Sequence, residues 1–170
     1  VRGKEMAQKK IFLHIGNHKT ATSTIQLGCC INRKALKEAG WLYPETGIFL
    51  NAHHNIVWEK SPGYPHTWNQ AKYWTNFVPR LGGMRKLLIE IEGSSAQNII
   101  ISAESFNQFS PVYIEKLKKD FKDYQVKVII YLREQSLFLQ SLWSQYVKSG
   151  LTTDDFHIFI NQILLSADDV

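Results

Sequence analysis

The chain has 170 residues, of which 44% are hydrophobic and 21% charged, a composition typical of a globular protein of about one domain. Four basic residues and one acidic residue among the first ten account for +3 of the formal net charge of +5. The rest of the chain is therefore only mildly basic, and nucleic acid is not a predicted partner. No run approaches the roughly 18 apolar residues of a membrane span, and no signal peptide is visible. The two cysteines, Cys29 and Cys30, are neighbours without a second pair, which excludes a zinc site and indicates a reducing, cytoplasmic compartment.

The hydrophobic pattern predicts strands that alternate with helices. The first part of the chain should contain a basic, disordered arm at 1–9, a strand at 10–15, a helix at 20–39 stopped by Gly40, and an extended piece at 41–44. The middle should contain a long irregular connection at 45–70 with a short helix at 51–60, and then a helical region that ends at 91. The last part should contain strands at 98–102 and 126–132, helices at 111–123 and 135–149, and a final helix capped by Thr152 or Thr153. The apolar stripe predicted for the first helix includes Ile25, Cys29 and Leu36. This alternation predicts one α/β domain at 10–170 with a mainly parallel sheet.

Three polar clusters follow the predicted strands, at 16–24, at 102–105 and at Arg133. Parallel sheets bind ligands at the carboxyl ends of their strands, so the clusters indicate one site. The first cluster begins with Gly16 and places Lys19 and four hydroxyl residues before a predicted helix. Backbone N–H groups at a helix start, together with the lysine charge, favour an anion such as phosphate. The lysine follows the glycine by only three residues, unlike the lysine of the magnesium-binding G-x-x-x-x-G-K-[ST] loop.

The segment 14–26, with the sequence HIGNHKTATSTIQ, resembles the opening of bacterial P-loop sulfotransferases that use 3′-phosphoadenosine 5′-phosphosulfate (PAPS). The family pattern is close to H-I-G-x-x-K-T-G-T-[ST]-[ST]-I-Q, and the resemblance continues through Asn32-Arg33, Leu36, Gly40 and Tyr43-Pro44. It implies a three-layer α/β/α sandwich like that of P-loop nucleoside triphosphate hydrolases. The loop residues that it implies for donor binding are Gly16, His18, Lys19, Thr20, Ala21, Thr22, Ser23 and Thr24. Ala21 replaces the usual glycine. An alanine is tolerated at this position if its φ angle stays negative.

A second motif of the same family binds the 3′-phosphate of the donor. It consists of an arginine at a strand end and a serine eight residues later, and Arg133 and Ser141 match it here. The physical basis is that a guanidinium offers a planar fork to phosphate oxygens while a hydroxyl donates beside it. The resemblance therefore implies that Arg133 and Ser141 complete the PAPS site.

Sulfuryl transfer resembles phosphoryl transfer and requires positioning, charge stabilisation and a base for the acceptor's proton. The resemblance gives Lys19 the role of neutralising the charge that develops on the leaving nucleotide. Glu104 stands where carbohydrate sulfotransferases have a glutamate base, and His54, or less favourably His53, is the alternative base. We prefer Glu104 because a strand end is more rigid than a loop. A structural role for Glu104, in an ion pair with Lys19 or Arg133, is a further alternative.

No metal is predicted, because only His14 and His18 have the spacing of a chelating pair and Gly16 lies between them at a turn. The expected acceptor is a small molecule or glycan with a hydroxyl or amine. Members of the family usually extend well beyond this length, and their C-terminal part supplies a lid over the nucleotide. A fragment without this lid and a degenerate member of the family are both open. Two alternatives remain open, a small P-loop nucleotide kinase and a non-catalytic nucleotide-binding relative without the lid.

Overall fold

The computed structural model describes residues 8–17, 19–60 and 82–167 of the chain. Residues 1–7 of the predicted arm and the predicted site residue His18 lie outside this part. The chain forms two compact units, Val1–Ile130 and Tyr131–Val170. The first unit contains the sheet and the second contains the last two helices.

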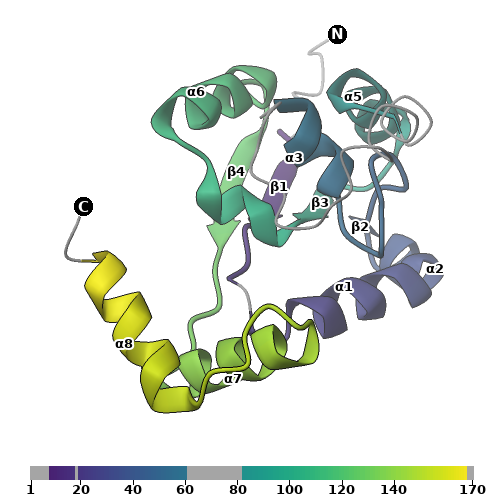
Figure 1. Ribbon diagram of the computed structural model, residues 1–170. Helices are drawn as coiled ribbons and strands as arrows, with labels where there is room; N and C mark the ends of the chain where they lie inside the picture. The colour runs from purple at the N-terminus through teal and green to yellow at the C-terminus, as the bar shows by residue number, and fades with distance from the viewer. Residues whose placement is uncertain (1–7, 18, 61–81, 168–170) are drawn as a thin grey trace, which may run out of the picture. The chain divides into compact units, whose positions relative to one another are not determined.

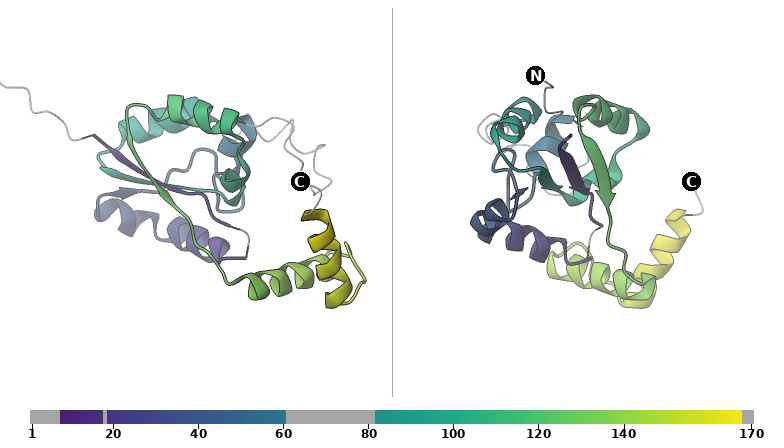
Figure 2. Two further views of the ribbon diagram at one scale, coloured as in Figure 1. Left: turned by 90° about the vertical axis from the view of Figure 1, so that its left-hand side faces the viewer. Right: turned by 180° about the vertical axis from the view of Figure 1, so that it is seen from behind.

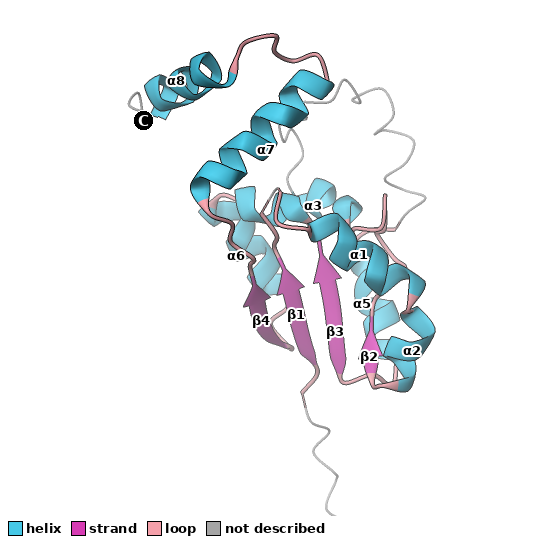
Figure 3. Cartoon of the chain, turned by 90° about the horizontal axis from the view of Figure 1, so that it is seen from below, coloured by secondary structure: helices cyan, strands magenta, loops and turns pink. Residues whose placement is uncertain are grey.

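The first unit is built on a parallel sheet of four strands in the order β2-β3-β1-β4 (Figure 3). The strands are β1 (Lys10–His14), β2 (Trp41–Leu42), β3 (Asn98–Ser102) and β4 (Gln125–Ile129). β1 is central and pairs with both β3 and β4, so that His14 lies between Ser102 and Ile129. Apolar, β-branched runs favour such strands, because they pack well in a sheet that is covered on both faces. The predicted α/β fold with a parallel sheet is confirmed.

Helices cover both faces of this sheet (Figures 1 and 2). One face carries α1 (Thr22–Ile31) and α2 (Arg33–Glu38). The other carries α3 (His54–Lys60), α5 (Met84–Gly93), α6 (Pro111–Asp120) and the short 3-10 helix η1 (Glu104–Gln108). This layering is compatible with the predicted three-layer sandwich. In the part of the chain that the structure describes, no helix is both long enough and apolar enough to cross a membrane.

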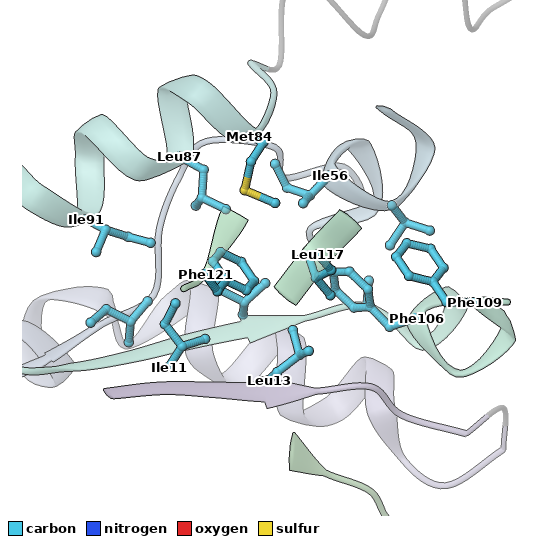
Figure 4. Packing of buried hydrophobic residues seen from close by; sticks show 14 residues of the cluster. Ile11, Leu13, Ile56, Met84, Leu87, Ile91, Phe106, Phe109, Leu117 and Phe121 are labelled. Atoms are coloured by element: carbon cyan, nitrogen blue, oxygen red, sulfur yellow. The ribbon is translucent and has the colours of Figure 1, made fainter. Parts of the chain in front are cut away.

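The main hydrophobic core lies between the sheet and the helices α3, α5 and α6 (Figure 4). Alternate residues of a strand point to opposite faces, so Ile11 and Leu13 of β1 enter this core while Phe12 faces the other side, where its ring packs on Trp41. The helices contribute fully or almost fully buried side chains, among them Ile56, Met84, Leu87, Ile91 and Leu117, and Phe121 joins them directly after α6. A firm core on one face therefore supports the carboxyl ends of β1 and β3.

The first predicted helix is interrupted, which corrects the continuous helix expected at 20–39. Asn32 leaves the helical conformation, with φ −103° and ψ 19°, and its side-chain amide donates to the carbonyl of Gly28. Asparagine can satisfy a backbone carbonyl locally in this way, and α1 ends at this residue before α2 begins at Arg33. The predicted stop at Gly40 is confirmed, since its φ is 80°.

The second unit consists of α7 (Gln135–Lys148) and α8 (Phe156–Ala167), joined through Gly150. Edge-to-face aromatic contacts hold the two helices together, one between Trp143 and Phe156 and the other between Tyr146 and Phe159. The predicted threonine cap of the last helix is wrong. Asp155 caps α8 instead, because its carboxylate accepts from the N–H groups of the first turn, whereas the Thr152 hydroxyl bonds to Asp154.

Lys9 marks the end of the predicted arm and is anchored to the first unit. Its Nζ donates to the carbonyls of Ile91, at 2.5 Å, and Ser94, at 2.7 Å, and its own carbonyl accepts from the N–H of Gln125. The ammonium thereby satisfies carbonyls at the end of α5, where a positive charge is also favoured by the helix dipole. The chain is thus held in place one residue before β1 begins.

Two residues of α5 provide a test of the core. Leu87 is fully buried and Ile89, on the same helix, is 63% exposed. Leu87→Ala leaves a cavity and is expected to lower the free energy of unfolding by about 2–5 kcal/mol. The matched control Ile89→Ala is expected to change it by less than about 0.5 kcal/mol. Urea unfolding followed by circular dichroism measures both, and equal losses would contradict the packing of α5 described above.

Candidate functional site

The candidate site lies where the connections from two neighbouring strands diverge. β1 leads through α1 and α2 to β2, beyond β3, whereas β3 leads through η1 and α6 to β4, on the other side of β1. The segments that leave β1 and β3 therefore go to opposite faces of the sheet (Figure 2). In doubly wound sheets this topological switch point is where ligands bind, at the carboxyl ends of the strands. Two of the predicted polar clusters, at 16–24 and 102–105, lie at this switch point.

Gly16 brings the first of these clusters against the second. Its φ is 63°, and a Cβ on it would lie 3.0 Å from both Glu104 Cα and Thr22 Cγ2. The left-handed conformation favours glycine, and the close approach leaves no room for a side chain. The glycine thus joins three elements, the end of β1, the start of α1 and the residues after β3.

The rest of the loop contains two further residues with a left-handed backbone, Lys19 with φ 64° and Ala21 with φ 62°. The condition set for Ala21, a negative φ, is therefore not met, and the alanine carries a strain of about 1 kcal/mol that a glycine would avoid. Within the described residues, no side chain caps the first turn of α1 at Ala21. Alternating backbone conformations of this kind turn successive N–H groups to one side, as in anion-binding nests.

The hydroxyl groups of the loop have different surroundings. Thr20 donates to the carbonyl of Asn17, at 2.6 Å, and thereby closes the loop on itself. Thr22 is buried, and its hydroxyl donates to Glu104 Oε1, also at 2.6 Å. Ser23 and Thr24 are exposed in the first turn of α1. Of the four hydroxyls predicted to bind the donor, those of Ser23 and Thr24 are thus on the surface, and that of Thr22 is hydrogen-bonded to the predicted base.

Glu104 is 9% exposed and accepts two side-chain hydrogen bonds from α1, one from Thr22 and one from the amide of Gln26 at 3.2 Å. Its Oε2 also lies 3.8 Å from Nε2 of His54. Burial alone would raise the pKa of Glu104, but hydrogen bonds from Thr22, from its own backbone N–H and from Gln26, with His54 nearby, lower it below the usual value for a glutamate. The carboxylate is therefore ionised at neutral pH.

The two histidines that were weighed as alternative bases differ sharply. His53 is fully buried, and its ring lies against backbone groups of Ser102 and Pro44. Burial lowers the pKa of His53 to about 3, so this imidazole is neutral and structural at physiological pH. His54 instead stacks on Trp58, with ring centroids 5.5 Å apart and planes 9° apart, and directs Nε2 toward Glu104. Glu104 and His54, which the sequence offered as alternative bases, are therefore neighbours in the structure.

Two polar residues in this region, His14 and Gln26, were not predicted as part of the site, and a third, Ser102, was predicted only as a member of the cluster at 102–105. Ser102 Oγ lies 2.7 Å from Nδ1 of His14 and accepts from the Gln26 amide at 3.1 Å. All three side chains are at least 97% buried, and burial lowers the pKa of His14 although Glu104 acts to raise it. For His14 and Ser102 the available signal was a polar residue at the end of a strand predicted to be buried, whereas Gln26 lay outside the apolar stripe predicted for its helix.

Arg133 and Ser141 belong to the second unit, where Arg133 is exposed and Ser141 is half-buried in α7. The adjacent Glu134 caps α7 by accepting from the N–H groups of Ser136 and Leu137. Over residues 8–17, 19–60 and 82–167 the structure contains no cluster of three or more histidine, cysteine, aspartate or glutamate side chains that could hold a metal ion.

Comparison of the chain with protein-family models, with curated proteins and with solved structures finds no match of any of the three kinds. A functional assignment therefore depends on the chemistry of the loop and of the residues around Glu104. The local resemblance over segment 14–26 adds a hypothesis for the ligand.

The close approach at Gly16 can be tested against a second glycine in the same region. Gly16→Ala is expected to lower the free energy of unfolding by at least about 2 kcal/mol, because the new methyl group meets Glu104 and the backbone is left-handed. Gly28 lies within α1 with open space around it, so Gly28→Ala is expected to raise stability by about 0.5–1 kcal/mol. Thermal unfolding of both variants measures the difference, and a harmless Gly16→Ala would contradict the contact.

Proposed function

We propose that this chain binds PAPS in the loop between β1 and α1 and transfers its sulfuryl group to a hydroxyl or amine of a small molecule or glycan. The observation that carries the proposal is the position of an ionised, buried carboxylate, Glu104, directly against a loop that leads into a helix N-terminus. Such a loop attracts an anion, and a carboxylate beside it can accept a proton from a nucleophile that attacks this anion.

Donor binding is supported by three features of the loop. The left-handed residues Gly16, Lys19 and Ala21 curve the backbone before α1, and the N-terminus of a helix of ten residues follows. Lys19 adds a positive charge to this region. Anions are stabilised by such N–H groups and by the positive end of the helix dipole, which suits the 5′-phosphosulfate. Arg133 and Ser141 are proposed, from the resemblance, to bind the 3′-phosphate.

The reaction would be an in-line displacement at sulfur. The acceptor oxygen or nitrogen forms a bond to sulfur while the bond from sulfur to the bridging oxygen of the 5′-phosphate breaks, which releases 3′,5′-bisphosphoadenosine. Glu104 takes the proton that the acceptor loses, and Lys19 neutralises the charge that develops on the bridging oxygen. His54, 3.8 Å from Glu104, adjoins the carboxylate that receives the proton.

A thermal-shift titration with 3′,5′-bisphosphoadenosine tests the donor site. At a ligand concentration of about 100 Kd the wild type should be stabilised by about 2.7 kcal/mol. Lys19→Ala should weaken binding at least tenfold, because it removes the proposed charge from the loop. The matched control Lys34→Ala, which removes an exposed lysine of α2, should leave the titration unchanged.

Two results would contradict the assignment. One is the absence of any shift in the wild type at saturating 3′,5′-bisphosphoadenosine. The other is stabilisation by ATP only when magnesium is present, with no response to the bisphosphate, which would favour a kinase. Equal weakening by Lys19→Ala and Lys34→Ala would show that the ligand responds to overall charge and not to the loop.

A further inference from the structure

Gln26 is a buried polar residue for which the proposed reaction has given no role. It is 2% exposed, and its amide nitrogen lies 3.1 Å from Ser102 Oγ and 3.2 Å from Glu104 Oε2. Ser102 is fully buried and lies 2.7 Å from Nδ1 of His14. A continuous set of hydrogen bonds therefore runs from β1 through the end of β3 to the carboxylate.

We propose that Gln26 is a positioning residue that fixes the orientation and the ionised state of Glu104, and that Ser102 and His14 hold the Gln26 amide in place. The inference rests on the proposed function, since it assigns Glu104 as the group that accepts the acceptor's proton. Gln26 does not touch the reacting atoms in this scheme. It acts through the carboxylate.

The chemistry of the amide fixes its orientation. The amide nitrogen of Gln26 donates one hydrogen bond to the hydroxyl oxygen of Ser102 and one to a carboxylate oxygen of Glu104. The reverse orientation would set the amide oxygen against the carboxylate, and two acceptors repel each other. Ser102 can then donate its own hydroxyl hydrogen to Nδ1 of His14, which fits a neutral imidazole, because burial lowers the pKa of His14.

Thr22 and Gln26 together hold the two oxygens of the carboxylate. Thr22 donates to Oε1 and Gln26 to Oε2. The two residues are four positions apart on α1 and therefore lie on the same face of the helix. The helix whose N-terminus is proposed to bind the donor thus also carries both side chains that orient the proposed base.

Loss of Gln26 has a defined electrostatic consequence. Hydrogen bonds to a carboxylate favour its ionised form, so removal of the Gln26 bond raises the pKa of Glu104. Among the described residues, the titratable groups that interact with Glu104 include His54 from α3, His14 from β1 and Tyr43 from the segment after β2. None of them is replaced in the Gln26→Met variant, so the shift reports the lost hydrogen bond.

The test is a pH titration of the Glu104 carboxyl by 13C NMR, with the signal assigned by Glu104→Gln. In Gln26→Met the pKa of Glu104 should rise by about one pH unit. The control Gln140→Met, at an exposed position of α7, should leave it unchanged. Ser102→Ala removes the other anchor of the amide and should shift the pKa in the same direction by a smaller amount, which also covers the case in which Gln26→Met does not fold.

The inference would be overturned if the pKa of Glu104 stayed within about 0.2 of the wild-type value in both Gln26→Met and Ser102→Ala. Titration of the same variants with 3′,5′-bisphosphoadenosine separates this failure from failure of the proposed function. Gln26→Met should bind the bisphosphate within about twofold of the wild type, because Gln26 acts on the base. If the wild type does not bind it, the donor assignment fails even where the Glu104 shift is observed.

Discussion

The close contact between Gly16 and Glu104 is the constraint on which the candidate site depends. Gly16 lies two residues after the central strand β1, and its lack of a side chain allows the backbone of Glu104 and the methyl group of Thr22 to approach. Once these segments meet, Thr22 and Gln26 can both donate to the same carboxylate. Any larger residue at 16 would separate the loop from the end of β3 and thereby separate the proposed anion site from the proposed base.

The fold could be predicted from the sequence where local preference and tertiary environment agree. The β-branched runs at Ile99–Ile101 and Val126–Ile129 became neighbours of β1 in a parallel sheet, and Gly40 ended the helical region as expected. The prediction was wrong where a local hydrogen bond decided the outcome. Asn32 bonds to Gly28 and interrupts a helix that otherwise has good periodicity, and Asp155 replaces the nearby threonines as the cap of α8.

Helix α1 shows why the site was only partly predictable. Its apolar stripe, which included Ile25 and Cys29, was expected to be buried, yet the buried residues of this helix are Thr22 and Gln26. Hydrogen bonds to Glu104 and Ser102 dock this face on the sheet, so the usual association between apolar pattern and burial fails here. Residues that depart from a folding rule in this way are often the ones that carry function.

The sequence could place Glu104 at a strand end but could not show what surrounds it. The distinction between His53 and His54 needs three-dimensional contacts, because the two residues are adjacent in the chain and differ only in burial and in the partners of their rings. The left-handed backbone of Ala21 could not be predicted either, because alanine rarely adopts a positive φ angle.

The central claim is that the backbone at the start of α1 binds the phosphate-bearing end of a nucleotide beside Glu104. Its most direct test is the perturbation of backbone amide signals in 1H–15N NMR spectra as 3′,5′-bisphosphoadenosine is added. The largest changes are predicted at residues 19–24 and at Glu104, while the amides of α5, on the opposite face of the sheet, remain in place. Saturable changes that leave 19–24 and Glu104 unaffected, or no changes at all, would contradict the claim.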